Sequence, residues 1–78
     1  MHERVGIIGL GYVGLPLVIR FCQVGKKVIG FDIDSEKVQA LQNGQSYISH
    51  IAEETIASLS SFEATDDMSR LGEPDALI

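Results

Sequence analysis

Short apolar runs alternate with amphipathic segments along the whole chain. The cores of segments Arg4–Ile8 and Lys27–Asp32 are continuously apolar, which is typical of strands in a parallel sheet that is covered on both faces. The segment between them carries apolar residues at helical spacing, and a helix is predicted there from Tyr12 to Val24. Gly25 is placed to end that helix, because glycine readily takes the left-handed backbone found there.

The second half of the chain continues this alternation. The pattern predicts helices at Ser35–Asn43, Ala52–Leu59 and Asp66–Leu71, a strand at Phe62–Thr65 and the start of another at Asp75–Ile78. Asp34 is expected to cap the first of these helices and Gly44 to end it. Thr65 or Asp66 is expected to cap the last. The stretch between Gly44 and Ser49 is expected to be a loop.

Strands that alternate with helices predict an α/β fold with a parallel sheet. Right-handed crossovers would place the strands in the order 3-2-1-4, with the first strand central. The predicted fold class is a Rossmann-type parallel sheet with flanking helices. Only strands 3-2-1 and the start of strand 4 are expected, so residues 1–78 are interpreted as the N-terminal part of one nucleotide-binding domain.

Composition narrows the choice of partners. The 78 residues carry a formal net charge of −5, and a chain without a basic stripe is not expected to bind nucleic acid or an anionic membrane. No apolar stretch is long enough for a membrane span. The N-terminus leads directly into a strand, so no signal peptide is expected and a cytoplasmic location is predicted. Cys22 is the only cysteine, and we interpret it as a packing residue.

A glycine-rich segment directly follows the first predicted strand. Gly9, Gly11 and Gly14 form the pattern G-x-G-x-x-G, and Asp32 closes the next apolar run. This is the dinucleotide-binding fingerprint in its proper setting, with the acid about 20 residues on. Gly9 would permit the tight turn, Gly11 a close approach of the pyrophosphate, and Gly14 close packing of helix on strand. The helix N-terminus would attract the phosphates through its dipole and its N–H groups.

The acidic residue predicts which dinucleotide binds. Asp32 would accept hydrogen bonds from the ribose hydroxyls of the adenosine, and its charge would repel a 2′-phosphate. The next residue is Ile33, not an arginine that could hold that phosphate. NAD rather than NADP is therefore the predicted cofactor. His2 and His50 have no partner at metal-ligand spacing, and no metal site is predicted.

The string GLGYVGLPL that begins at Gly9, followed by Gly30–Asp34 and Lys37-Val38, resembles the N-terminal region of the UDP-glucose/GDP-mannose dehydrogenases. These enzymes use NAD to oxidise nucleotide sugars at C6. The segments Asn43–Ile48 and His50-Ile51 look most like the branch that acts on UDP-N-acetylglucosamine, the UDP-N-acetyl-D-glucosamine 6-dehydrogenases.

The resemblance implies a set of cofactor-binding residues: Gly9, Leu10, Gly11, Tyr12, Val13, Gly14, Asp32 and Lys37. Gly9 to Gly14 would line the pyrophosphate, with the N–H groups of Tyr12 and Val13 as donors. Lys37 would reach the adenosine end, although a solvated helix residue is an equally good interpretation of it.

The chemistry implied by the resemblance is a pair of hydride transfers to two NAD⁺, which take the C6 alcohol to a carboxylate. The family's catalytic cysteine, lysine and asparagine have no counterparts here, and Cys22 does not match the catalytic position. The chain alone is therefore predicted to be inactive, and its parent enzyme is expected to be a homo-oligomer. UDP-N-acetylmannosamine, UDP-glucose and GDP-mannose stay open as substrates. A non-catalytic NAD(H)-sensing module is the alternative from another functional class.

Overall fold

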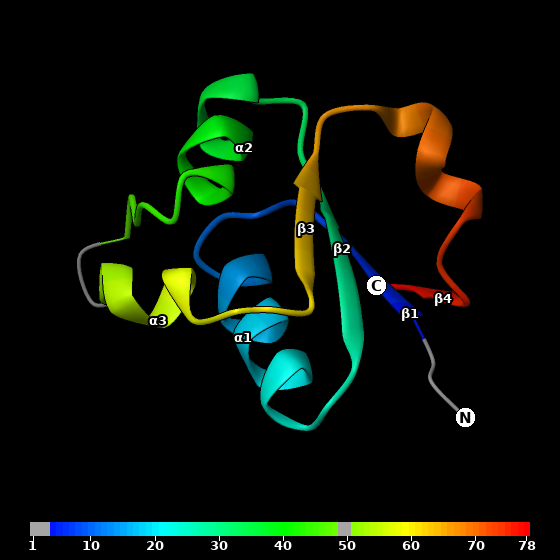
Figure 1. The fold of residues 1–78 in the computed structure, drawn as a ribbon. Helices are drawn as coiled ribbons and strands as arrows, with labels where there is room; N and C mark the ends of the chain where they lie inside the picture. The colour runs from blue at the N-terminus through cyan, green and yellow to red at the C-terminus, as the bar shows by residue number, and fades with distance from the viewer. Residues whose placement is uncertain (1–3, 49–50) are drawn as a thin grey trace.

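The computed structural model describes residues 4–48 and 51–78. Helices separate successive strands along the chain (Figure 1). In chain order the elements are β1 (Arg4–Ile8), α1 (Gly14–Gln23), β2 (Lys27–Phe31), α2 (Ser35–Gln42), α3 (Glu53–Ala57), β3 (Phe62–Thr65), the 3-10 helix η1 (Met68–Gly72) and β4 (Ala76–Leu77). Two of the helices, α2 and α3, lie between β2 and β3.

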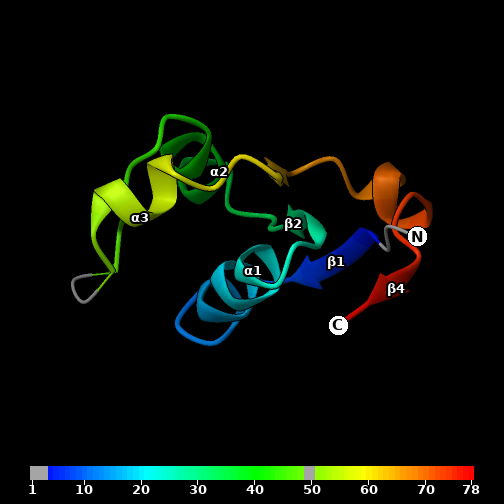
Figure 2. The same ribbon diagram turned by 60° about the horizontal axis from the view of Figure 1, so that its bottom comes forward.

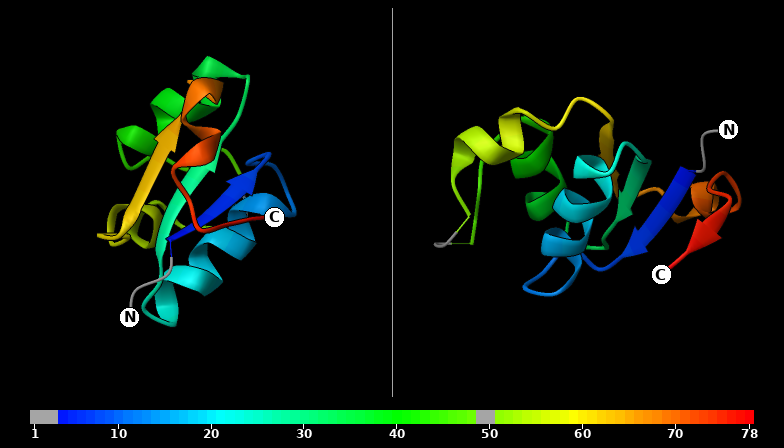
Figure 3. Two further views of the ribbon diagram at one scale, coloured as in Figure 1. Left: turned by 90° about the vertical axis from the view of Figure 1, so that its right-hand side faces the viewer. Right: turned by 90° about the horizontal axis from the view of Figure 1, so that it is seen from below.

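The strands form one parallel sheet in the order β3-β2-β1-β4. This confirms the predicted Rossmann-type topology, including the central position of β1. Val5 of β1 pairs with Val28 of β2 on one side and with Ala76 of β4 on the other. The elements that follow β3, η1 and β4, lie at the opposite end of the molecule from α3 (Figures 2 and 3).

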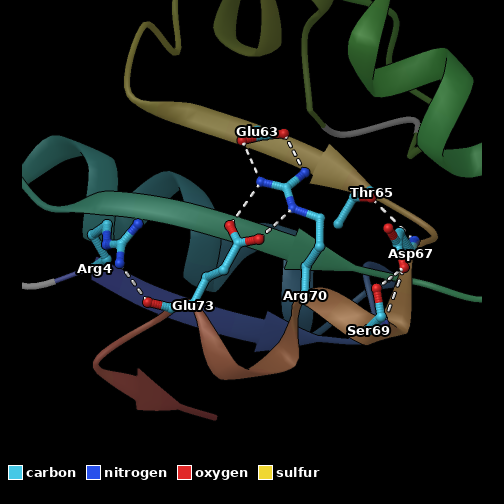
Figure 4. Close-up of polar contacts among 7 residues, drawn as sticks. All are labelled: Arg4, Glu63, Thr65, Asp67, Ser69, Arg70 and Glu73. Atoms are coloured by element: carbon cyan, nitrogen blue, oxygen red, sulfur yellow. Dashed lines mark hydrogen bonds and ion pairs between the residues drawn. The ribbon is translucent and has the colours of Figure 1, made fainter.

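Alternate residues of the strands face α1 and α2 and form the core. The buried residues of this core are Val5, Ile7, Leu10, Leu15, Val18, Val28, Val38, Leu41, Ile48, Ile56 and Ala64. Phe31 is also fully buried but is not part of this cluster. The connection through η1 crosses the sheet on the face opposite to α1 (Figure 4).

An ion-pair network fastens this connection to the sheet. Arg70 of η1 pairs with Glu63 of β3 and with Glu73, and Arg4 of β1 donates to the backbone carbonyl of Glu73 (Figure 4). The contacts join the strand at one edge of the sheet to the central strand. The network therefore holds the β3–β4 crossover against the sheet and places β4 beside β1.

Several predicted boundaries differ from the structure. Helix α1 begins at Gly14 rather than Tyr12, because Gly9–Val13 form a separate loop, and α3 covers only part of its predicted range. The last helix is a short 3-10 helix, and the prediction that Thr65 or Asp66 caps it is wrong. Asp67 is its cap and accepts a hydrogen bond from the N–H of Ser69.

Other helix ends agree with the sequence. The carboxylate of Asp34 caps α2 by accepting the N–H of Glu36 at 3.0 Å. Gly25 and Gly44 follow the ends of α1 and α2 with φ of 86° and 72°. These left-handed values suit glycine because it has no Cβ. Within the ranges 4–48 and 51–78, no helix is long and apolar enough to cross a membrane.

Candidate functional site

The glycine loop lies at the carboxyl end of β1, between that strand and α1. Gly9 has a φ of 88°, which a side chain would strain, and its N–H donates to the carbonyl of Phe31 at 2.7 Å. A Cβ on Gly14 would lie 1.6 Å from the carbonyl oxygen of Gly9. The turn and the contact between helix and strand therefore both depend on glycine, as the fingerprint predicted.

Gly11 faces open space instead. A Cβ built on it meets no atom within 4 Å. The residue borders a pocket of about 480 Å³ that extends toward α2 and another of about 420 Å³ between the loop and Ile78. A ligand could therefore approach the backbone at Gly11 from either side.

The N-terminus of α1 presents donors to this space. Val13 is its N-cap, and no side chain caps it. The N–H groups of Gly11, Val13 and Gly14 donate to no acceptor in the described ranges 4–48 and 51–78. Such N–H groups, together with the positive end of the helix dipole, form an anion-binding site.

Asp32 follows β2 and binds the glycine loop directly. Its Oδ2 accepts the N–H of Leu10 at 2.8 Å, and its Oδ1 accepts the N–H of Asp34 at 2.9 Å. Partial burial raises the pKa of Asp32. The backbone donors of Asp34, Leu10 and Ile33, together with the charge of Lys37, outweigh that effect and leave the pKa below its usual value. Asp32 is therefore an ionised acceptor at neutral pH.

Lys37 and Tyr47 form the far wall of the larger pocket. The Nζ of Lys37 lies 5.8 Å from the centroid of the Tyr47 ring, within the range of a cation–π contact. The hydroxyl of Tyr47 donates a hydrogen bond to the backbone carbonyl of Leu10. Burial, followed by the charges of Asp32 and Asp34, raises the pKa of Tyr47 to about 12.

The structure brings the predicted residues to one edge of the sheet but gives them different surroundings. The Leu10 side chain is fully buried, and both its N–H and its C=O are hydrogen-bonded within the protein. The side chains of Tyr12 and Val13 are exposed. Tyr47 lies in the segment predicted to be a loop, and sequence reasoning missed it. Its only signal was a lone aromatic residue in a polar stretch.

Among the residues that the structure describes, the remaining candidates, which are metal-ligand types and the cysteine, add no further site. Within the described part of the chain, no group of His, Cys, Asp and Glu residues is arranged to hold a metal ion. His2 and His50 lie outside the described residues. Cys22 is half-buried on α1. Burial raises the pKa of its thiol, against the opposing effect of a hydrogen bond with Ser61.

Comparison with known proteins identifies the family and its cofactor. The profile of the UDP-glucose/GDP-mannose dehydrogenase family, NAD binding domain, matches residues 3–78. The chain belongs to this family. Because the matching region is the family's NAD-binding domain, the cofactor is NAD, as the glycine fingerprint and Asp32 predicted. The open surface at Gly11 and the free N–H groups of the loop fit a pyrophosphate.

Individual relatives act on several sugars. The UDP-N-acetyl-D-glucosamine 6-dehydrogenase of Salmonella typhi is 33% identical over 90% of this chain and 16% of its own length. The UDP-N-acetyl-D-mannosamine dehydrogenase of Pyrococcus horikoshii is 42% identical over 58% of this chain and 11% of its own. The chain thus spans less than a fifth of the length of these relatives.

Solved structures show the same fold. The NDP-N-acetyl-D-galactosaminuronic acid dehydrogenase of Methanosarcina mazei superposes on 97% of this chain and 18% of its own, with a TM-score of 0.83 and 32% identity. The UDP-glucose dehydrogenase of Pyrobaculum islandicum covers 99% of this chain and 19% of its own, with a TM-score of 0.82 and 25% identity.

Proposed function

We propose that this chain is the NAD-binding portion of a nucleotide-sugar 6-dehydrogenase. The parent enzyme would oxidise the C6 hydroxyl of UDP-N-acetylglucosamine to the carboxylate with two NAD⁺. One observation supports this most directly: a glycine loop with unused N–H groups lies hydrogen-bonded to Asp32, in a chain of this family.

Each residue of the site has a task in this proposal. The loop from Gly9 to Gly14 lines the pyrophosphate, through N–H groups and through the open surface at Gly11. Asp32 accepts hydrogen bonds from the ribose hydroxyls and repels a 2′-phosphate. Lys37, on the wall of the larger pocket, contacts the adenosine end. NAD supplies the hydride acceptor when bound. The groups that act on the sugar belong to the rest of the parent enzyme, so the chain alone is inactive.

UDP-N-acetylglucosamine is favoured by the resemblance of residues 43–48 and 50–51 to the branch that acts on this sugar. The Salmonella typhi enzyme aligns with 90% of the chain, including the segment between α2 and α3 that suggested this sugar. UDP-N-acetylmannosamine is the second candidate, supported by the 42% identity of the Pyrococcus horikoshii enzyme over a shorter stretch. We also propose that the parent enzyme is a cytoplasmic homo-oligomer.

An NMR titration of the chain with NAD⁺, and separately with NADP⁺, tests the cofactor site. We expect NAD⁺ to shift the amide signals of Gly9–Gly14, Asp32 and Lys37, and NADP⁺ to bind more weakly because of the charge of Asp32. A well-dispersed spectrum that does not respond at these residues would contradict the proposal. Tighter binding of NADP⁺ would contradict the role given to Asp32.

Activity assays of the protein that carries this chain test the substrate. NADH formation is followed with UDP-N-acetylglucosamine, UDP-N-acetylmannosamine, UDP-glucose and GDP-mannose, and the first is expected to give the highest kcat/KM. A higher value with UDP-N-acetylmannosamine would favour the second candidate. NAD binding without NADH formation from any of the four sugars would favour an NAD(H)-sensing module.

A further inference from the structure

Tyr47 connects the segment between α2 and α3 to the glycine loop. The neighbouring residue Ile48 is 2% exposed and belongs to the core. The segment is therefore held in place directly beside Tyr47. From that position the hydroxyl of Tyr47 donates to the backbone carbonyl of Leu10, which is 37 positions away in the sequence. This hydrogen bond joins a segment outside the fingerprint to the loop that the fingerprint describes.

Leu10 is fixed by this contact and by two others. Its N–H donates to the carboxylate of Asp32 at 2.8 Å. Its fully buried side chain lies where a Cβ on Gly30 would come within 2.7 Å of it. The residue directly before Gly11 is therefore held by its donor, its acceptor and its side chain. The position of Leu10 therefore sets the direction of the free N–H groups that follow it in the loop.

The carbonyl of Leu10 is also the acceptor that the N–H of Gly14 would use if α1 began one hydrogen bond earlier. The first such bond in the structure runs instead from the N–H of Leu15 to the carbonyl of Gly11, at 3.1 Å. With its carbonyl bonded to Tyr47, Leu10 competes less well for the N–H of Gly14. That N–H then stays available to a ligand.

We infer that Tyr47 is a positioning residue for the cofactor. Its hydroxyl holds the Leu10 carbonyl by a hydrogen bond and so orients the N–H groups of the glycine loop before NAD binds. This inference rests on the proposed NAD-binding function. A loop that is ordered in advance loses less conformational entropy on binding, and the affinity is higher for that reason. The raised pKa of Tyr47 keeps the hydroxyl protonated, and hence a donor, at neutral and mildly alkaline pH.

The test compares Tyr47→Phe with Ser61→Ala in the full chain. Tyr47→Phe removes the hydroxyl and leaves the ring beneath Lys37 in place. The Ser61 hydroxyl also donates to a distant backbone carbonyl, that of Lys26, at 3.0 Å. Lys26 immediately precedes β2, whereas the glycine loop and Asp32 follow the carboxyl ends of their strands. Ser61→Ala therefore removes a hydrogen bond of the same kind away from the loop.

We expect Tyr47→Phe to weaken NAD binding by about two- to tenfold, the range that corresponds to one net hydrogen bond. Ser61→Ala should lower Tm by about as much as Tyr47→Phe does, but it should leave NAD affinity unchanged. The ¹³C shift of the Leu10 carbonyl should change in Tyr47→Phe and not in Ser61→Ala. A merely structural role for Tyr47 would not separate the two variants in this way.

Three outcomes would count against the inference or its basis. Equal NAD affinity for Tyr47→Phe and the unaltered chain would overturn the inference alone. An unaltered chain that is folded but does not bind NAD would overturn the proposed function. If Tyr47→Phe did not fold, the inference would still be tested in the unaltered chain, by the ¹³C shift of the Leu10 carbonyl. A Leu10 carbonyl shift that changes strongly when NAD is added would show that the loop is not set in advance.

Discussion

Alanine in place of Gly14 and alanine in place of Gly11 should have opposite effects on the stability of this chain. The two glycines lie three residues apart in one motif, but the structure surrounds them differently. A Cβ at Gly14 would lie 1.6 Å from the Gly9 carbonyl oxygen and 2.8 Å from its carbonyl carbon. A Cβ at Gly11 would meet nothing within 4 Å. We expect Gly14→Ala to destabilise the fold, and Gly11→Ala to stabilise it slightly while weakening ligand binding.

The size of the first effect follows from what must move. The atoms that a Cβ on Gly14 would strike are backbone, so no side-chain rotation relieves the contact, and α1 must shift away from β1. Overpacking of this kind costs about 1–3 kcal/mol, and more where the backbone cannot yield. A domain of this size is stable by about 4–12 kcal/mol. We therefore expect Gly14→Ala to lose at least about 3 kcal/mol.

The second effect has the other sign. The φ of Gly11 is not in the left-handed region, so alanine fits there without strain. Its smaller unfolded-state entropy should raise stability by about 0.4–1 kcal/mol. The added methyl group would project into the space next to the free N–H groups, so we expect NAD binding to weaken. Gly11→Val should weaken it further because its side chain is larger.

Urea unfolding followed by circular dichroism measures stability, and calorimetric titration measures NAD affinity, in each variant and in the unaltered chain. Gly14→Ala with an unchanged free energy of unfolding would refute the close packing of α1 on the glycine loop. Unfolding of the chain by Gly11→Ala would refute the open position of that residue. NAD affinity unaffected by Gly11→Val would remove the loop backbone from the cofactor site.

Three further outcomes are expected. Asp32→Ala should weaken NAD binding about 10-fold or more and lower stability by about 1–2 kcal/mol, since the N–H groups of Leu10 and Asp34 lose a charged acceptor; calorimetry and urea unfolding check this. Stability should fall above pH 10, because the pKa of Tyr47 is about 12 in the folded chain and about 10 in the unfolded one. Between these values only the unfolded chain loses the proton, so Tm measured against pH should decline less steeply in Tyr47→Phe. Arg70→Met should lower Tm without changing NAD affinity, since Arg70 pairs with Glu63 on the face opposite to α1.

The topology could be predicted because it depends on local patterns and one general rule. Apolar runs marked β1 and β2, helical spacing marked α1 and α2, and right-handed crossovers then fixed the order β3-β2-β1-β4. The caps at Asp34, Gly25 and Gly44 were equally local, because each depends on backbone within a few residues. Such features can be predicted because each depends on residues that are close together in the sequence.

The short helix after β3 shows where local patterns fail. Thr65, Asp66 and Asp67 can each accept a backbone N–H, and the sequence does not rank them. In the structure Thr65 is the last residue of β3, and its hydroxyl accepts the N–H of Asp67. Asp67 is then left to cap η1. The strand had to be placed before the cap could be chosen.

Tyr47 could not be predicted for a different reason. Its acceptor is the Leu10 carbonyl, which any sequence possesses and which lies 37 positions away. A contact between a side chain and a distant backbone group leaves no residue pattern to recognise. Tyr47 is placed next to the loop by tertiary packing, of Ile48 into the core and of Tyr47 itself against that core.

The environment of Asp32 determines which variants can separate binding from folding. The fingerprint predicts one role for this residue, toward the ribose, but both of its carboxylate oxygens already accept backbone N–H groups. Each oxygen has two lone-pair sites, so these bonds leave room for hydroxyl donors. One carboxylate can therefore hold the loop and the ligand together, and its removal perturbs both. Gly11, which meets no neighbour, and Tyr47, whose ring survives loss of the hydroxyl, are the positions where affinity can change while the fold does not.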